Sequence, residues 1–249
     1  MKKSVLTLLF LSLLAIPSFA QLSNSPDTFE TENGELMIFP INHGTVAFTF
    51  DGKTIFVDPF GGAEKFTNFD APDVIFITDI HGDHLNAETL AGLDTENTIF
   101  VVPQAVADAL DESLKKNLII IANEETKVVL GMNVTGVAMY NLPDDESSRH
   151  KKGRGNGYII DFGGKLVYLS GDTEDVPEMR NLENIDIAFV CMNLPYTMDI
   201  FQAASAVVQF QPAIMYPYHH RGQDIEKFKA IVDLAEIDTE VRLKDWYSN

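Results

Sequence analysis

Short apolar stretches alternate with polar turns through the first half of the chain, and they have the length of strands rather than helices. They are rich in β-branched and aromatic residues, and Asp51-Gly52 between two of them is typical of a hairpin turn. Helical segments are expected at 86–93 and at 103–114, where Pro103 occupies the first turn. We expect strands at residues 36–40, 45–50, 54–57, 74–78, 98–102, 118–121, 126–130 and 133–140.

The last third of the chain alternates between strands and helices. It opens with a hairpin in which Gly163 and Gly164 join the strands 157–161 and 165–169. Further strands are expected at 185–191, 213–216 and 240–243, with helices at 200–210 and 224–234. A β-rich first half followed by this alternation predicts an α/β fold, with two sheets between outer helices in a four-layer αββα sandwich.

The first twenty residues have the pattern of an export signal. Lys2 and Lys3 precede an apolar run at 5–16, and Ser18-Phe19-Ala20 has the small-x-small pattern of a cleavage site. The run is short for a membrane span, and no cysteine follows it that would carry a lipid anchor. An uncleaved anchor is the alternative. We expect a signal peptide at 1–20, one large domain at 21–249 with a loose lead-in at 21–33, and export to a bacterial periplasm without a stable membrane anchor.

The composition narrows the range of partners. The formal net charge of −19 describes an acidic surface that repels nucleic acid and anionic lipid. The basic cluster at 149–154 is interpreted as a solvated loop, with attraction of an anionic substrate as the alternative. Cys191 is the sole cysteine, so an intramolecular disulfide is excluded, and its apolar surroundings favour a buried thiol. We therefore expect a small-molecule substrate.

The densest group of chemically active side chains directly follows the strand at 74–78. Asp79, His81, Asp83 and His84 lie in one short segment, and Gly82 lets the backbone turn among them. A strand that ends in a tight loop of imidazoles and carboxylates aims several ligands at one point, and this combination suits zinc, manganese or iron. An exposed polar loop is the alternative, but the chain has only six histidines to distribute.

Three more candidate ligands lie near ends of predicted strands: His150 before 157–161, Asp172 after 165–169, and His219 after 213–216. Taken singly, each has an ordinary structural explanation. Together they supply the imidazoles and the bridging carboxylate that a two-metal site requires. Ligands from several strand ends also converge naturally at one edge of a layered sheet.

The ordered set resembles the metallo-β-lactamase superfamily, whose signature is His-x-His-x-Asp-His followed by a distant His, an Asp and a last His. More narrowly, the chain resembles the branch that includes ascorbate-phosphate lactonase and other metal-dependent hydrolases. The segments that carry this resemblance are Asn42-His43-Gly44, Ile55-Phe56-Val57-Asp58-Pro59, Ser170-Gly171-Asp172-Thr173, Thr197-Met198-Asp199 and Pro217-Tyr218-His219. It implies the αββα fold of that superfamily and a hydrolase domain at 21–249.

The resemblance also implies two divalent metal ions, zinc or manganese, with iron as a further choice. The first metal would be held by Asp79, His81 and His150, the second by Asp83, His84 and His219, and Asp172 would bridge them. Asp58 would orient ligands through hydrogen bonds. His43 would act in the same way or face the substrate, and a structural role is equally open.

Two positions leave alternatives open. Asp79 stands where the signature has its first histidine. Its carboxylate favours manganese or iron relative to an all-imidazole set, and it leaves open a weak first subsite and a single-metal, sensing or non-catalytic domain. His220 adjoins His219, and the Pro-x-His pattern favours His219. His220 and Arg221 would then face the cleft or the surface, where Arg221 is a candidate for binding a phosphate or carboxylate.

Metal-activated water is the hydrolytic route that the sequence supports. Two metals lower the pKa of a shared water from about 16 toward roughly 7 to 9, and the resulting hydroxide attacks a carbonyl or phosphoryl centre. Asp83 is the candidate catalytic residue, which orients the nucleophile or passes a proton to the leaving group. No Gly-x-Ser-x-Gly motif is present. We expect a small ester, lactone or phosphodiester substrate, with a β-lactamase proper as the less favoured alternative.

Overall fold

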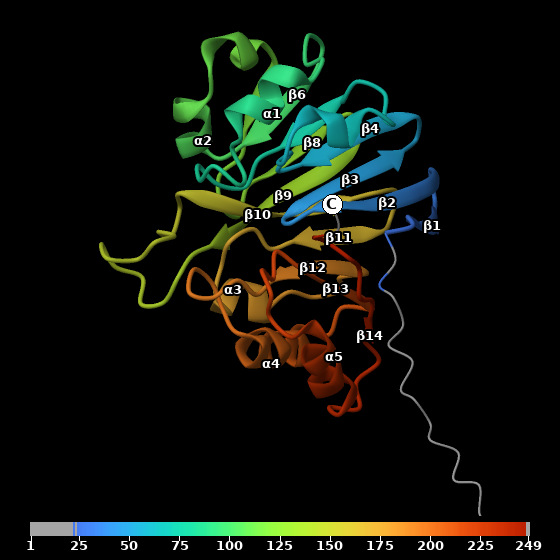
Figure 1. The fold of residues 1–249 in the computed structure, drawn as a ribbon, viewed down its shortest axis with the longest axis vertical. Helices are drawn as coiled ribbons and strands as arrows, with labels where there is room; N and C mark the ends of the chain where they lie inside the picture. The colour runs from blue at the N-terminus through green and yellow to red at the C-terminus, as the bar shows by residue number, and fades with distance from the viewer. Residues whose placement is uncertain (1–21, 23, 248–249) are drawn as a thin grey trace, which may run out of the picture.

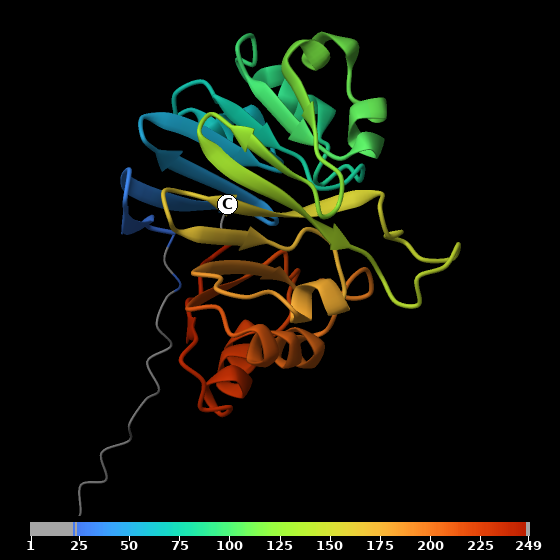
Figure 2. The same cartoon turned by 180° about the vertical axis from the view of Figure 1, so that it is seen from behind.

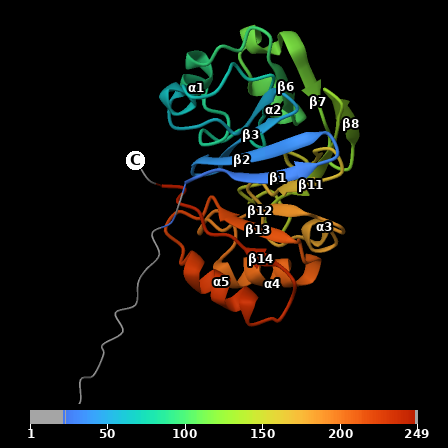
Figure 3. The same ribbon diagram turned by 90° about the vertical axis from the view of Figure 1, so that its right-hand side faces the viewer.

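The computed structural model describes residues 22 and 24–247, and two seven-stranded sheets pack face to face at its centre (Figure 1). Helices α1 (Ala87–Gly92) and α2 (Gln104–Ala109) cover the outer face of the first sheet. Helices α3 (Pro177–Arg180), α4 (Ile200–Phe210) and α5 (Ile225–Asp233) cover the outer face of the second. Figure 3 shows the layers in profile. The predicted α/β fold with an αββα sandwich is confirmed.

The first sheet begins antiparallel and becomes parallel. Strands β1 to β4 pair antiparallel, and β4 to β7 pair parallel. Parallel neighbours need crossover connections, and α1 and α2 lie within these connections. In sheet order the strands are β1 (Asp27–Thr31), β2 (Gly34–Asn42), β3 (Thr45–Phe50), β4 (Lys53–Val57), β5 (Val74–Phe76), β6 (Ile99–Val102) and β7 (Leu118–Ile120).

The second sheet repeats this plan. Its strands β8 to β11 pair antiparallel and β11 to β14 pair parallel. The strands are β8 (Thr126–Val129), β9 (Met132–Met139), β10 (Gly155–Asp161), β11 (Leu166–Leu169), β12 (Ile187–Cys191), β13 (Ile214–Tyr218) and β14 (Glu240–Val241). Each half therefore offers the carboxyl ends of parallel strands, where side chains from the following loops can meet.

The main core lies between the sheets. Phe48 of the first sheet and Phe162, beside the second, have ring centroids 5.2 Å apart, and both side chains are fully buried. All of β12 is buried, including Cys191, as its apolar surroundings predicted. Burial raises the pKa of this thiol to about 11. A second apolar cluster fills the space between the first sheet and α1 and α2.

Most predicted elements are present, with boundaries that differ by at most two residues. The predicted helix at 103–114 is wrong in its second half, because Leu110 is extended and Asp111 caps a separate 3-10 turn, Glu112–Asn117. The loose lead-in predicted at 21–33 is wrong for Asp27–Thr31, which pairs with β2 as an edge strand.

The signal peptide predicted at 1–20 and its cleavage before Gln21 lie outside the described residues. Among the described residues, no helix is long and apolar enough to cross a membrane. The segment 140–154 between β9 and β10 projects beyond the sheets, as Figure 2 shows from behind. His150 lies in this segment, close to the start of β10.

Candidate metal centre

The candidate ligands lie where loops at the ends of strands from both sheets meet. The segment 79–84 follows β5, Asp172 follows β11, and His219 follows β13. His150 comes from the projecting segment 140–154 and folds back so that its side chain is fully buried. The structure thus brings together all of the residues that the sequence proposed as metal ligands.

The first subsite is formed by Asp79, His81 and His150, whose potential ligand atoms all lie within 4.8 Å of one another. Nδ1 of His81 lies 2.6 Å from Oδ2 of Asp79, and Nε2 of His150 lies 3.9 Å from the same oxygen. Both nitrogens are buried, and neither makes a well-directed hydrogen bond among the described residues despite these close approaches. Buried nitrogens that converge without hydrogen bonds are suited to a shared cation.

In the second subsite, Asp83, His84 and His219 are the ligands predicted for the second metal, and the structure groups His219 with Asp83 and His43 and also with His84 and Asp172. Nε2 of His219 lies 3.5 Å from Oδ2 of Asp83, and Nε2 of His84 lies 4.0 Å from its Oδ1. Both imidazole nitrogens are buried and have no hydrogen-bond partner in the described part of the chain. The rings of His84 and His219 stack with their centroids 5.1 Å apart. Their Nε2 atoms lie 3.4 and 3.5 Å from the two oxygens of Asp172, so they face the same space.

Asp172 lies between the two subsites. Its Oδ2 is 3.2 Å from Nε2 of His150 and 3.4 Å from Nε2 of His84. Its Oδ1 is 3.5 Å from Nε2 of His219. One buried carboxylate therefore reaches an imidazole of the first subsite and two of the second, which is the placement required of a bridging ligand.

The electrostatics of the cluster favour a cation. Burial opposes ionisation of Asp172, yet the charges of His219 and His84 lower its pKa well below the usual range. For Asp79, burial is likewise outweighed, chiefly by contact with His81, and the pKa falls to about 2. Burial lowers the pKa of His84, but Asp58 and Asp172 raise it well above its usual value. The carboxylates stay charged at neutral pH, and divalent metal can replace the imidazolium protons.

Hydrogen bonds fix which nitrogen each imidazole directs inward. Nδ1 of His84 lies 2.8 Å from Oδ2 of Asp58, whose Oδ1 accepts a hydrogen bond from the backbone N–H of Thr78. Nδ1 of His150 lies 2.8 Å from Oδ1 of Asn141. A proton on each Nδ1 leaves each Nε2 lone pair free. Asp58 thus takes the orienting position that the resemblance implied, whereas Asn141 was not identified from the sequence.

His43 lies at the edge of the second subsite. Its Nε2 is 3.2 Å from Oδ2 of Asp83, and its Nδ1 is 2.9 Å from the hydroxyl of Tyr247. The backbone N–H of Arg221 donates to this hydroxyl, which can therefore give its own proton to His43. His43 then holds its proton on Nε2 and donates it to Asp83. Sequence reasoning missed Tyr247, which lies 204 positions from His43.

Close packing separates the roles of His219 and its neighbour. The backbone N–H of His219 donates to the carbonyl of His43, and Gly44 makes this approach possible because a Cβ there would lie 2.6 Å from the His219 ring. His220 is buried, but no contact between its ring and the candidate ligands is found among the described residues, and it packs against Tyr247. Arg221 is exposed.

Arg154 is a third residue that the sequence interpretation missed, after Asn141 and Tyr247. Its Nε donates to Oδ1 of Asp79 over 3.1 Å, and its Nη2 donates to Oδ2 over 3.0 Å. The interpretation of 149–154 as a solvated loop is therefore wrong at Arg154. The available signal was a chemical one, because a buried aspartate in the place of a neutral histidine requires a positive partner.

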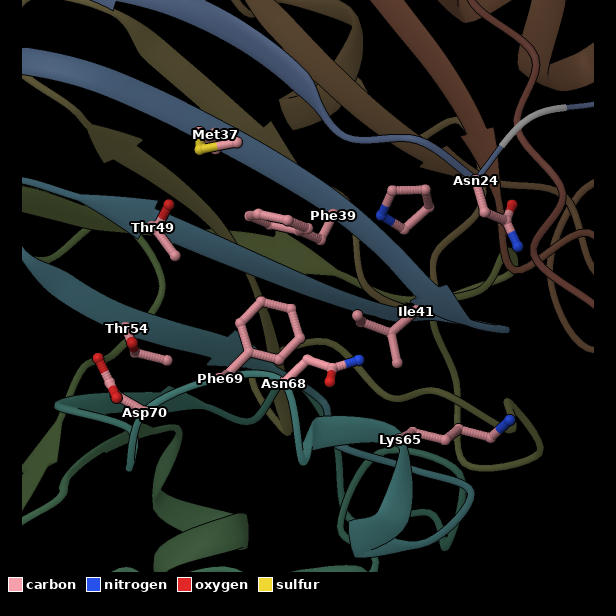
Figure 4. A pocket seen from close by; sticks show the side chains of 11 residues that line it. Asn24, Met37, Phe39, Ile41, Thr49, Thr54, Lys65, Asn68, Phe69 and Asp70 are labelled. Carbon is pink, nitrogen blue, oxygen red and sulfur yellow. The ribbon is translucent and has the colours of Figure 1, made fainter.

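A separate pocket lies on the outer side of the first sheet (Figure 4). Phe39 and Ile41 of β2 line it together with Phe69 and Lys65, and the rings of Phe39 and Phe69 meet edge to face at 5.0 Å. None of the candidate ligands lines this pocket. It is therefore distinct from the metal centre.

Comparisons with known proteins agree with the geometry. A family model described as a beta-lactamase superfamily domain matches residues 38–219. A solved structure of a candidate metal-dependent hydrolase from Parabacteroides distasonis is 36% identical, covers 90% of this chain and 99% of that chain, and has a TM-score of 0.79.

Similar proteins are also found in archaea. A protein of Thermococcus onnurineus named UPF0173 metal-dependent hydrolase is 31% identical, over 78% of this chain and 92% of its own length. A novel metallo hydrolase from Ignicoccus hospitalis is 22% identical and has a TM-score of 0.72, with 86% of this chain and 96% of that chain covered. At this lower identity the likeness shows the fold alone.

Proposed function

The chain belongs to the metallo-β-lactamase superfamily and is a metal-dependent hydrolase of that superfamily, and we propose that it uses two divalent metal ions to hydrolyse a small ester, lactone or phosphodiester. Zinc and manganese are the proposed metals, with iron as a further choice. The observation that carries the proposal is the position of Asp172 between two groups of buried, unpartnered imidazole nitrogens.

The side chains divide into holding and reacting roles. Asp79, His81 and His150 would hold one metal. Asp83, His84 and His219 would hold the other, and Asp172 would contact both. When bound, the metals would supply an acidified water and polarise the carbonyl or phosphoryl oxygen under attack. The choice of His219 over His220 is supported by its 3.5 Å approaches to Asp83 and Asp172.

Asp83 is the proposed catalytic carboxylate. Its side chain is 26% exposed, whereas those of Asp79 and Asp172 are almost fully buried, so Asp83 can reach a substrate from within the cluster. His43 donates to Oδ2 of Asp83, which leaves Oδ1 to orient a water or to accept its proton and pass it to the leaving group. His43 itself fixes the orientation of this carboxylate.

Two alternatives are less well supported. A degraded, single-metal or sensing domain would not require the fully buried Asp79 carboxylate to converge with His81 and His150 on one point. For a β-lactamase proper, no observation adds to the superfamily membership. A nitrocefin assay separates this second alternative from the proposal.

Metal analysis followed by chelation tests the proposal. We expect close to two metal ions per chain, and turnover of a member of an ester, lactone and phosphodiester panel. Chelation should abolish turnover, and the restored metal should recover it. At a hundred times Kd each site adds about 2.7 kcal/mol of stability, which raises the Tm of a chain of this size by roughly 5 to 11 °C. Turnover that survives complete metal removal would refute the proposal.

A further inference from the structure

A buried ion pair joins the first subsite to the projecting segment. The guanidinium of Arg154 donates to both carboxylate oxygens of Asp79, over 3.1 and 3.0 Å. The Asp79 side chain is fully buried, and that of Arg154 is 20% exposed. This two-point geometry fixes the plane of the carboxylate more firmly than a single contact would.

Backbone pairing brings the two residues together across 75 positions of sequence. The backbone N–H of Asn156 donates to the carbonyl of Thr78 over 3.0 Å. Gly155 permits this contact, because a Cβ at that position would lie 2.8 Å from the same carbonyl oxygen. Arg154 directly precedes Gly155 and Asp79 directly follows Thr78, so the ion pair is built into the junction of the two sheets.

The positive charge of Arg154 balances the negative charge that Asp79 brings to the first subsite. Three neutral imidazoles in the first subsite would carry no net charge, whereas Asp79 with His81 and His150 carries one negative charge. The guanidinium of Arg154 returns the group to zero. Oδ2 of Asp79 remains 2.6 Å from Nδ1 of His81, and a carboxylate oxygen has a further lone pair for a metal.

We propose that Arg154 is a positioning residue of the first subsite, which holds the Asp79 carboxylate in place and cancels its charge so that the pair substitutes for one neutral imidazole ligand. The inference rests on the proposed function, because it takes Asp79 as a metal ligand. It follows that Asp79 and Arg154 together replace the first histidine of the signature, and that Asp79 does not mark a degraded site. Asp79→His alone should therefore not improve metal binding.

The decisive experiment compares the wild type with Asp79→His, Arg154→Gln and the double variant. Zinc and manganese stoichiometry and affinity are measured by elemental analysis and chelator competition, with circular dichroism to verify folding. We expect Asp79→His to weaken one of the two sites at least about tenfold, because an unpaired guanidinium then faces the cation. The double variant should regain two metals per chain.

Arg154→Gln alone gives an independent readout. The metal-free protein should lose thermal stability, since a buried carboxylate loses its partner, and the rise in Tm on adding metal should exceed that of the wild type. Lys152→Gln is the matched control, because it removes an equal charge two residues away, where the side chain pairs with Glu178. It should change neither quantity.

The outcomes separate this inference from the proposed function. If the wild type binds no metal even in excess, the proposed function fails. If the wild type binds two metals and folded Asp79→His binds them equally tightly, only the role of Arg154 fails. A double variant that binds metal no better than Asp79→His, or a Lys152→Gln protein that behaves like Arg154→Gln, would also overturn the inference.

Discussion

Both subsites are suited to a divalent cation, but the charges of their side chains are balanced differently. In the first subsite, the charge of Asp79 is already balanced by Arg154. In the second, Asp83 receives a hydrogen bond from His43, and no Lys or Arg side chain pairs with it among the described residues. The second subsite thus keeps a negative charge for the metal to neutralise. Charge alone predicts that the second subsite binds a divalent cation more tightly.

The chain segments that carry the ligands of the two subsites also differ in how well they are packed. His150 and Arg154 of the first both belong to the projecting segment 140–154, most of which is exposed. His219 of the second follows β13, a strand inside the second sheet, and its backbone is tied to His43. Segments with few buried contacts open locally at lower free energy. Both charge and support therefore make the first subsite the weaker one.

The largest effect should come from the residue that the subsites share. Asp172→Asn keeps the size of the side chain but removes the charge that contacts His150, His84 and His219. We expect both metals to be lost together and kcat/KM to fall on the order of a thousandfold. Metal content and steady-state kinetics measure the two effects.

The control for Asp172→Asn is Asp94→Asn, which makes the same change at an exposed position. It should leave metal content and kinetics unchanged. Loss of one metal only from Asp172→Asn would place this carboxylate in a single subsite. The two subsites would then not share Asp172 as a ligand.

The next effect should separate the subsites. Asp58 orients His84 and Asn141 orients His150, each through a hydrogen bond of 2.8 Å to Nδ1. Loss of such a partner typically lowers metal affinity by about 10- to 100-fold. Asp58→Asn should therefore weaken the second subsite, and Asn141→Ala the first.

Stepwise chelator titration of each variant measures which of the two subsites loses its metal at the lower chelator concentration. Each protein serves as the control for the other, since both substitutions alter an orienting partner and spare every proposed ligand. A loss of metal affinity at both subsites in either variant would show that the two subsites are coupled and do not bind metal independently.

The candidate ligands could be predicted because their signals are local. Asp79, His81, Asp83 and His84 follow a recognisable apolar strand, and the type of each residue states its chemistry. The order of predicted strands and helices along the chain likewise predicted the layers of the fold. The short helix α3 and the edge strand β1 were missed, because a single turn and a half-exposed polar strand leave no clear period.

The orienting residues could not be predicted in the same way. Arg154 and Tyr247 reach their partners across 75 and 204 positions, and each lies in a polar segment with an ordinary surface composition. The choice between His219 and His220 also depended on tertiary packing, since adjacent residues differ only in the direction of their side chains. Such contacts follow from how the two sheets meet, which local patterns do not encode.

The smallest effect should come from the outermost link of the second subsite. Tyr247→Phe removes the hydroxyl that donates to Nδ1 of His43 and leaves that buried nitrogen without its partner. His43 is then free to exchange its proton between the two nitrogens, and its contact with Asp83 weakens. We expect a loss of about 1 kcal/mol in stability and a several-fold lower kcat, with the first subsite unchanged.

Tyr196→Phe is the matched control for Tyr247→Phe. The centroid of the Tyr196 ring lies 4.4 Å from the guanidinium carbon of Arg149, so this change removes a tyrosine hydroxyl that is not linked to His43. No hydrogen bond of the Tyr196 hydroxyl is found within the described residues, and kinetics and metal affinity should stay at wild-type values. If Tyr247→Phe also leaves kcat unchanged, the Tyr247–His43 link does not orient Asp83. The asymmetry between the subsites would then rest on the charge of Arg154 and on the exposed segment that carries His150 and Arg154.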